Sequence, residues 1–576
     1  MLAWEMWAVD IDTRDDPPFL PTWNRPQAEV RMKPSIATLL KLTVGLLLAG
    51  SSLTTAHAVD RSLRDFIDSE IATTWQREKV TPAAPSTDAE FLRRIYLDLA
   101  GIIPTYDEAV AFLHDKSPDK RQQLIDRLLD HPRYAQHQAD LWDLILFGRN
   151  PPGYGTDKRD GIQRWLRDQF AANRPYDAMI RDLLKADGNS VEQGPPMYYV
   201  QFRNQPEDLN EKVTQTFLGV QLQCARCHDH PFDDWKQTDF FGMAAFFARL
   251  QVVEVGKKDN LAMYAIGEKN TGDVLFTGPA KDQAPGKKGE PIKPKFLLGD
   301  GLNEPPLPAD YKEPKMDDKK PPPAPLFSRK DQLVEWIVKT DNPYFARAIA
   351  NRIWGQYLGR GIVHPVDNLS PSNAPTHPAL LDAITAWLIE KKFDLKALTR
   401  ELVNSKTYQL SSNGATGEPQ PLWFQHGRVR PLSAEELGES WRVATGYDEA
   451  TKDKPQEKTP SRFRPLTGDY VLRFLGQPNN GVGDFQGGLS EHLYFNNGQL
   501  GSLFLTAPGS LLAAIGNKEK SAEERLDRLF LQTLSRQPTA AERERFTDFM
   551  NTKPDDDRSR DLVWALLTCS EFRFNH

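Results

Sequence analysis

Cysteine is scarce in this chain, which has three cysteines among its 576 residues. The sequence also lacks a nucleophile elbow, a P-loop and a dinucleotide-binding fingerprint, so the commonest hydrolase and nucleotide-enzyme signatures are excluded. One C-x-x-C is present, but no βαβ pattern surrounds it, which argues against a thioredoxin-like exchange protein. The chemistry of this protein therefore has to be sought in less common motifs.

Strong charge of one sign and long apolar runs are missing as well. The formal net charge is -7, which is mild for this length, and no long basic stripe is visible, so we expect no nucleic-acid partner. Beyond the N-terminal segment no run of about 18 apolar residues occurs, which predicts that the mature chain has no integral membrane span. Composition otherwise indicates a globular protein of two to four domains.

The N-terminal 58 residues are expected to lie outside the folded protein. Basic residues following Met32, the apolar run 42–50 and the A-x-A site ending at Ala58 together form a signal-peptide pattern. Residues 1–31 precede this pattern and are interpreted as a misassigned upstream start. The sequence thus predicts a signal peptide over 32–58, cleavage near Ala58, and a protein exported to the periplasm or the cell surface.

The remaining chain is predicted to be mostly α, with two helical domains and a small β-containing insertion between them. Helical periodicity dominates residues 59–250, which hold the C-x-x-C, and returns over 328–576, where a Pro- and Lys-rich patch at 451–465 suggests a subdivision. Residues 251–327 contain short β-like runs and then a Pro/Lys-rich linker.

Capping boxes mark several helix starts in this pattern. The pairs share a Ser or Thr followed three residues later by Glu, and they are Thr105/Glu108, Ser433/Glu436, Ser521/Glu524 and Thr539/Glu542. The stretch from Tyr96 to Glu108 also parallels the stretch from Phe530 to Glu542 at identical spacing. Two independent helix junctions with the same caps explain this parallel more simply than duplication does.

Cys224-Ala-Arg-Cys227-His228 carries the most specific chemical signal in the chain. C-x-x-C-H is the attachment signature of c-type haem, in which both thiols bond covalently to the haem and the histidine ligates the iron. Our first hypothesis is therefore haem c, held by Cys224, Cys227 and His228, with an electron-transfer or redox role and a redox partner protein. The candidates for a sixth iron ligand are methionines, at positions Met197, Met243 and Met263.

Two other interpretations of the same residues stay open. Cys224, Cys227, His228 and His230 place four N/S donors within seven residues, which suits tetrahedral zinc, with Asp229 or Asp233 as further donors. Alternatively, Cys224 and Cys227 form a disulfide that caps a helix, as an oxidising compartment allows. The third cysteine, Cys569, is predicted to be a buried thiol in an apolar helix.

A second group of polar residues lies in the C-terminal domain. Its members are Asn351, Arg352, Arg360, His364, Asp367, Asn373 and His377. Asp and His can supply acid–base chemistry, so the alternative function is an extracytoplasmic hydrolase or carbohydrate-associated protein whose C-x-x-C-H is a disulfide or zinc site. The same residue types more often cap helices and order turns.

Long motifs in both halves resemble two known families. The segment 217–235, centred on the C-x-x-C-H, and the segment 91–105 resemble the domain of unknown function 1549. The segments 342–361, 371–373 and 565–576 resemble its habitual partner, the domain of unknown function 1553. The resemblance implies exported proteins of planctomycete-type bacteria, in which similar chains often carry an additional cytochrome c-like module. It implies no activity.

Overall fold

The structure is a computed structural model of the 576-residue chain, which divides into two units, residues 1–59 and 60–576. It describes residues 62–148, 160–203, 205–258, 261–278, 289–315, 320, 322–414, 421–452, 493, 495–496, 499–517, 519–552 and 556–576. The predicted signal peptide and the patch at 451–465, apart from residues 451 and 452, lie outside the described residues. All that follows concerns the second unit.

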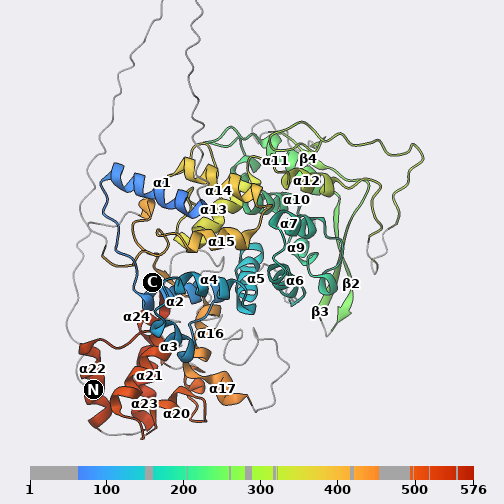
Figure 1. The fold of residues 1–576 in the computed structure, drawn as a ribbon. Coiled ribbons are helices and arrows are strands. Elements are labelled where there is room, and N and C mark those ends of the chain that lie inside the picture. The colour runs from blue at the N-terminus through green and yellow to red at the C-terminus, as the bar shows by residue number, and fades with distance from the viewer. Residues whose placement is uncertain are drawn as a thin grey trace, which may run out of the picture. The chain divides into compact units, whose positions relative to one another are not determined.

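Helices make up most of the described chain, as predicted. Those before the insertion are α1 (Leu63–Glu78), α2 (Asp88–Ala100), α3 (Tyr106–His114), α4 (Lys120–Leu129), α5 (Pro132–Phe147), α6 (Asp160–Ala171), α7 (Tyr176–Lys185), α8 (Ser190–Gln193), α9 (Met197–Val200), α10 (Pro206–Val213), the π-helix η1 (Thr214–Leu218), the 3₁₀ turn η2 (Gln223–Arg226), α11 (Gln237–Ala244) and η3 (Ala245–Phe247). Figure 1 shows their order along the chain.

The insertion contains short antiparallel strands. They are β2 (Leu250–Lys258), β3 (Leu261–Glu268), β4 (Val274–Phe276) and β5 (Glu290–Ile292), and β1 (Gly188–Asn189) joins them from the preceding region. The strand order is β1-β3-β2 in one sheet, where Val252 pairs with Ile266, and β4 pairs with β5 in another. The predicted β-like runs are therefore confirmed as strands.

Helices resume after the insertion. They are α12 (Arg329–Ile337), α13 (Phe345–Leu358), α14 (Pro378–Glu390), α15 (Leu395–Val403), η5 (Pro421–Trp423), α16 (Ala434–Thr445), α17 (Tyr447–Thr451), η7 (Gln499–Leu503), α20 (Leu511–Ile515), α21 (Ala522–Leu534), α22 (Ala540–Thr552), α23 (Asp556–Thr568) and α24 (Ser570–Arg573). Strands β6 (Arg430–Pro431) and β7 (Phe574–Asn575) pair with each other.

Helix α2 is buried on every side. Its apolar residues at i, i+4 and i+8 predict an amphipathic helix, yet Arg93, Arg94 and Asp98 on its other faces are also buried. Buried charges need partners. The Arg93 guanidinium donates to the carbonyls of Thr533 and Phe572, so segments more than 400 residues away surround this helix.

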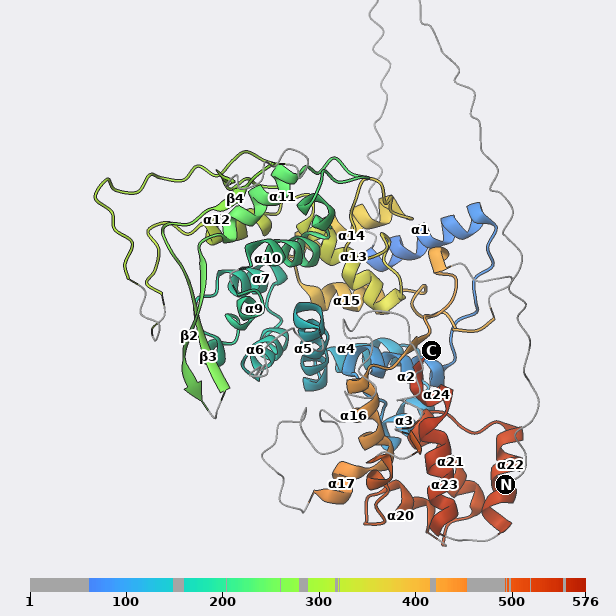
Figure 2. The same ribbon diagram turned by 180° about the vertical axis from the view of Figure 1, so that it is seen from behind.

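The two predicted helical domains share their cores. One cluster of buried residues runs from Leu63 on α1 to Phe424, so it takes in helices from both sides of the insertion. The second cluster contains Leu97 and Ile103 together with residues of α16, α20, α21 and α23. Figure 2 shows α3 beside α21, and α3 also packs on α2, its neighbour in the sequence.

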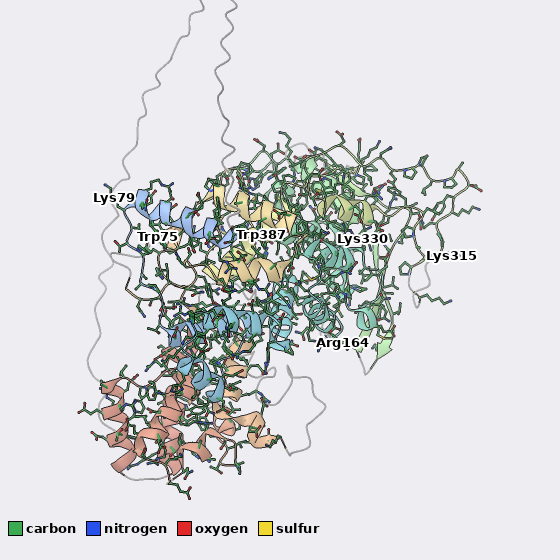
Figure 3. All side chains as sticks on the ribbon, viewed as in Figure 1. Trp75, Lys79, Arg164, Lys315, Lys330 and Trp387 are labelled. Carbon is green, nitrogen blue, oxygen red and sulfur yellow. The ribbon has the colours of Figure 1, made fainter. Side chains whose placement is uncertain are left out.

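Long side chains join elements across the unit. Helix α1 packs on α14, and Figure 3 labels Trp75 and Trp387 on these helices. The Trp75 indole donates to the Trp423 carbonyl at 2.7 Å. Lys330 on α12, also labelled in Figure 3, donates to the last carbonyls of α7 and to Asp187, 2.6 Å away. A cation at a helix C-terminus is favourable because the helix dipole is negative there.

Cys569 differs from its prediction. It is half-buried and lies at the junction between α23 and α24, where it is the N-terminal cap residue of α24. Its side chain packs against the second core. The apolar run 562–567 that surrounds it in the sequence does form a helix, but that helix ends one residue before the thiol.

Candidate functional site

The C-x-x-C-H motif lies on its own turn rather than at the end of a long helix. The sequence pattern predicts that the motif closes a helix beginning near Pro206, and this prediction is wrong because the helical run ends at Gly219. Helix α10 widens into the π-helix η1, which ends at Gly219 in a left-handed conformation with φ of +65°. A Cβ at Gly219 would lie 3.0 Å from the Leu369 side chain. The positive φ favours glycine, and the close approach leaves little room for a side chain. The turn η2 follows after a short link.

The turn presents both thiols outward. Ala225 is fully buried between Cys224 and Cys227, whose side chains are exposed and free. The backbone N–H of Cys227 donates to the Cys224 carbonyl at 3.3 Å, and the N–H of His228 donates to the same carbonyl at 3.4 Å. The inward methyl group anchors the turn, and the two sulfur atoms remain accessible on the surface.

The imidazole of His228 is oriented by a backbone carbonyl. Its Nδ1 lies 2.8 Å from the Asp229 main-chain oxygen, and the residue is exposed. An oxygen acceptor at this distance assigns the proton to Nδ1, which leaves the lone pair on Nε2. Metal-ligating histidines are held in the same way, with one nitrogen donating to a carbonyl and the other free to bind.

His230 has the opposite arrangement. Its Nδ1 accepts from the backbone N–H groups of Phe232, at 3.3 Å, and Asp233, at 3.0 Å. The Asp233 carboxylate is 3.5 Å from the same nitrogen, too far to outweigh two donors. The proton is therefore on Nε2, and the single lone pair of the neutral ring is used by the backbone. His230 closes the loop that follows the motif.

Asp233 fastens this loop to the C-terminal domain. Its buried carboxylate accepts hydrogen bonds from the hydroxyls of Ser370 and Ser372. Trp235 at the end of the loop packs near Tyr344, with ring centroids 6.5 Å apart. Burial, and then the negative charge of Asp233, raise the pKa of Tyr344. These contacts, the Asp233 clamp, give Asp233 a role other than that of a metal ligand.

The zinc and sixth-ligand hypotheses gain no assembled site. Among the residues that the structure describes, no three His, Cys, Asp or Glu side chains are grouped so that they would hold a metal ion. Met197 and Met243 are buried in the core, and Met263 lies half-buried on β3, whereas the motif is exposed. Zinc and an axial methionine thus stay predictions from the sequence.

The polar group of the C-terminal domain mostly braces a loop. Asn351 donates to the carbonyls of Val363 and Val366 and accepts from the Val363 N–H at 2.9 Å. Asn373 donates to the carbonyls of His364 and Asn368. These bonds satisfy backbone groups that the irregular chain leaves open, which favours the structural interpretation of this cluster. Arg360 lies in the same region and is half-buried.

The same loop contacts the segment that leads into the motif. The Asp367 carboxylate accepts from the amides of Gln215, at 2.6 Å, and Gln221, at 3.2 Å. Arg352 donates to the Thr216 carbonyl, and the Leu369 N–H donates to the Gly219 carbonyl at 2.7 Å. The structure therefore brings together the two motif groups that the sequence could only treat separately.

Lys212 is a chemically unusual residue that sequence analysis did not identify. It lies on α10 just before the π-helix, and its ammonium donates to the Ile145 carbonyl at 2.7 Å. Burial, followed by the nearby Arg352 guanidinium, lowers its pKa to about 8. A single sequence carries no signal for this shift, because it comes from burial by helices distant in the chain.

Two family models match the chain, one on each side of the insertion. Residues 66–252 match PSCyt2, described as a protein of unknown function (DUF1549), and residues 329–479 match PSD1, described as a protein of unknown function (DUF1553). The pairing of these two families, predicted from the motifs, is confirmed. No curated protein and no solved structure matches the chain. No helix within the described ranges combines the length and the apolar character needed to cross a membrane.

Proposed function

We propose that this protein binds one c-type haem covalently through Cys224 and Cys227, with His228 as an iron ligand, and that it acts in electron transfer or another redox process. The observation that carries the proposal is the arrangement of His228. Its Nδ1 is held by a carbonyl at 2.8 Å and its Nε2 is left with the lone pair, directly after two free, exposed thiols.

The residues present fit the group. Haem attachment needs two thiols in this order and a histidine with one nitrogen available for iron, and the turn supplies both. When bound, haem c supplies reversible one-electron chemistry at its iron. Cys224 and Cys227 would anchor it, and the Asp229 carbonyl would hold the His228 ring in its orientation, as backbone carbonyls do for other metal-binding histidines.

Exposure of the motif also favours this function. The thiols lie on the surface of a folded unit, where an attachment enzyme or a partner protein can reach them. Since c-type haem is attached outside the cytoplasm, the proposal includes export of the chain, as the N-terminal sequence pattern predicts. The polar group at 351–377 is taken up in loop bracing, so the proposed function is not based on it.

The experiment is expression of the chain in a host that has cytochrome c maturation machinery. We expect a Soret-absorbing chromophore that stays with the polypeptide after denaturation. The double variant Cys224→Ser with Cys227→Ser should lose it, whereas His230→Ala, whose ring serves the loop, should keep it. His228→Ala should retain covalent colour with an altered Soret maximum. A chromophore that survives loss of both cysteines would contradict the proposal.

A further inference from the structure

The most exposed of the large apolar side chains in the described part of the chain belongs to the motif loop. Phe232 is 80% exposed, compared with 66% for Leu326, which is next. A large aromatic ring held in water loses the stabilisation that burial would provide, and contact with another molecule would restore it.

Phe232 is held rigidly in this exposed position. Its neighbours His230 and Asp233 have side chains that are only 10% and 5% exposed. Pro231 fixes φ before it, its own N–H donates to His230, and the His230 N–H donates to the Trp235 carbonyl at 2.7 Å. These bonds fix the backbone on both sides of Phe232, and its ring lies 6.4 Å from the His230 ring in a T-shaped arrangement, so less backbone entropy is lost when a partner binds.

The surface around the motif is acidic. Arg226 is paired with Asp208 at 2.7 Å and with Glu211 at 3.3 Å. Lys236 is near Asp229, and Asp234 is a further exposed carboxylate beside Phe232. This part of the surface therefore has four carboxylates and only two cationic side chains. Binding of a second copy of this chain through the same surface would place acidic residues against acidic residues, which is unfavourable. A partner with a basic surface would be attracted to these carboxylates.

We infer that Phe232 and the acidic residues around the motif form the docking surface for a basic electron-transfer protein. The inference rests on the proposed function and names the partner of that same site. An apolar depression on the partner would receive the ring, and lysines or arginines around it would face the exposed carboxylates of Asp229 and Asp234. Aromatic residues at the centre of an interface with charges at the rim are the usual arrangement of binding hot spots.

The test is the rate of electron transfer between the haem-loaded full chain and a small basic cytochrome c. The transfer is measured in the direction that the two reduction potentials favour. One electron is lost by the reduced protein and gained by the oxidised one. We expect the rate to fall steeply with ionic strength. Phe232→Ser should slow it about tenfold, and Asp234→Lys should slow it several-fold. Leu326→Ser, the matched exposed-apolar control, should leave it unchanged.

A small neutral redox reagent and an acidic cytochrome complete the design. The reagent should react equally with all variants, and the acidic cytochrome should react more slowly than the basic one. Equal rates for Phe232→Ser and wild type, or no preference for the basic probe, would overturn the inference while the chromophore remains. A changed absorption spectrum in Phe232→Ser would place the ring against the haem and also overturn it. A chain without covalent haem would refute the proposed function, and the docking surface with it.

Discussion

At the scale of single residues, His228 and His230 show how backbone contacts separate two similar side chains. They are two positions apart and both lie in an exposed loop, yet one donates through Nδ1 to a carbonyl and the other accepts through Nδ1 from two N–H groups. The two-residue spacing in the sequence does not show whether both histidines are available as ligands or whether one of them only stabilises the loop. Only the hydrogen bonds assign the proton, and with it the ring nitrogen that keeps a lone pair.

His377 gives a prediction at the same scale. It is buried against Phe424 at the start of α14, and burial, followed by the positive charge of Arg77, lowers its pKa to about 4. The unfolded chain, with a histidine pKa of about 6.5, binds the proton first as pH falls. His377 thus contributes stability above pH 6.5 that is lost as pH falls towards 4.

The measurement is denaturant unfolding at pH 7 and pH 4.5. The variant His377→Asn keeps a polar residue at the start of the helix. The free energy of unfolding of wild type minus that of this variant should be smaller at pH 4.5 than at pH 7, by about 1–2 kcal/mol after allowance for solvent screening. Other buried histidines such as His137 are present in both proteins, so they cancel in the comparison. A stability difference that is the same at both pH values would show that His377 does not titrate in this way.

At the scale of elements, two helical hairpins repeat the same design. Helix α2 ends at Gly101 and α21 ends at Ser535, both in left-handed conformation, and Thr105 and Thr539 then cap the following helices with their glutamates. The spacing parallel in the sequence is thus matched in the structure, because α2 and α21 both have 13 residues and α3 and α22 both begin one residue after the capping threonine. Helices α3 and α21 also pack together, and Leu97 and Ile103 of the first hairpin lie in the same buried cluster as α21.

The Asp233 clamp provides a prediction for a contact between two loops. The double variant Ser370→Ala with Ser372→Ala removes both hydroxyl donors and leaves a buried carboxylate without them, which should cost about 2–3 kcal/mol. Backbone amides over 228–236 should exchange with deuterium faster than in wild type. Thr385→Ala is the control, because its hydroxyl serves only its own helix. Unchanged exchange over 228–236 in the double variant would mean that the clamp does not hold the loop.

At the scale of the whole molecule, the regions matched by the two families depend on each other. Arg94 of α2 donates to the carbonyls of Tyr408 and Leu410. Asp98, on the same helix, is buried and pairs with Arg430. Arg430 in turn forms an ion pair with Glu436. Burial by itself would raise the pKa of Glu436, but the pairing with Arg430 outweighs this effect and lowers the pKa to about 2.

This interdependence predicts that the unit 60–576 unfolds in a single transition. In a fragment of residues 60–328, the side chains of Arg93, Arg94 and Asp98 lose their partners. Burying these charges without partners costs free energy of folding. We expect the fragment to show no cooperative thermal transition in calorimetry, while co-expression with residues 329–576 restores one. A fragment of residues 60–328 that unfolds cooperatively by itself would contradict the interdependence of the two regions.

Local features of the fold could be predicted from the sequence, but its long-range contacts could not. Capping boxes and the strands at Val252 and Val274 depend on neighbouring residues, and they were predicted correctly. The partners of Arg93 lie more than 400 residues further along the chain, and those of Asp367 lie on the other side of the insertion. Periodicity carries no information about such distant partners. The helix predicted to reach the motif ends instead at Gly219. The Gly219 carbonyl accepts from the Leu369 N–H, a contact with a distant segment that periodicity cannot predict.

The most direct test of the central claim is the intact mass of the chain purified from a host with cytochrome c maturation machinery. We expect the mass of the polypeptide plus one haem under denaturing conditions, with the added mass on the peptide that contains Cys224 and Cys227. A mass equal to the polypeptide alone, or reduced by the two hydrogens lost in a Cys224–Cys227 disulfide, would contradict it.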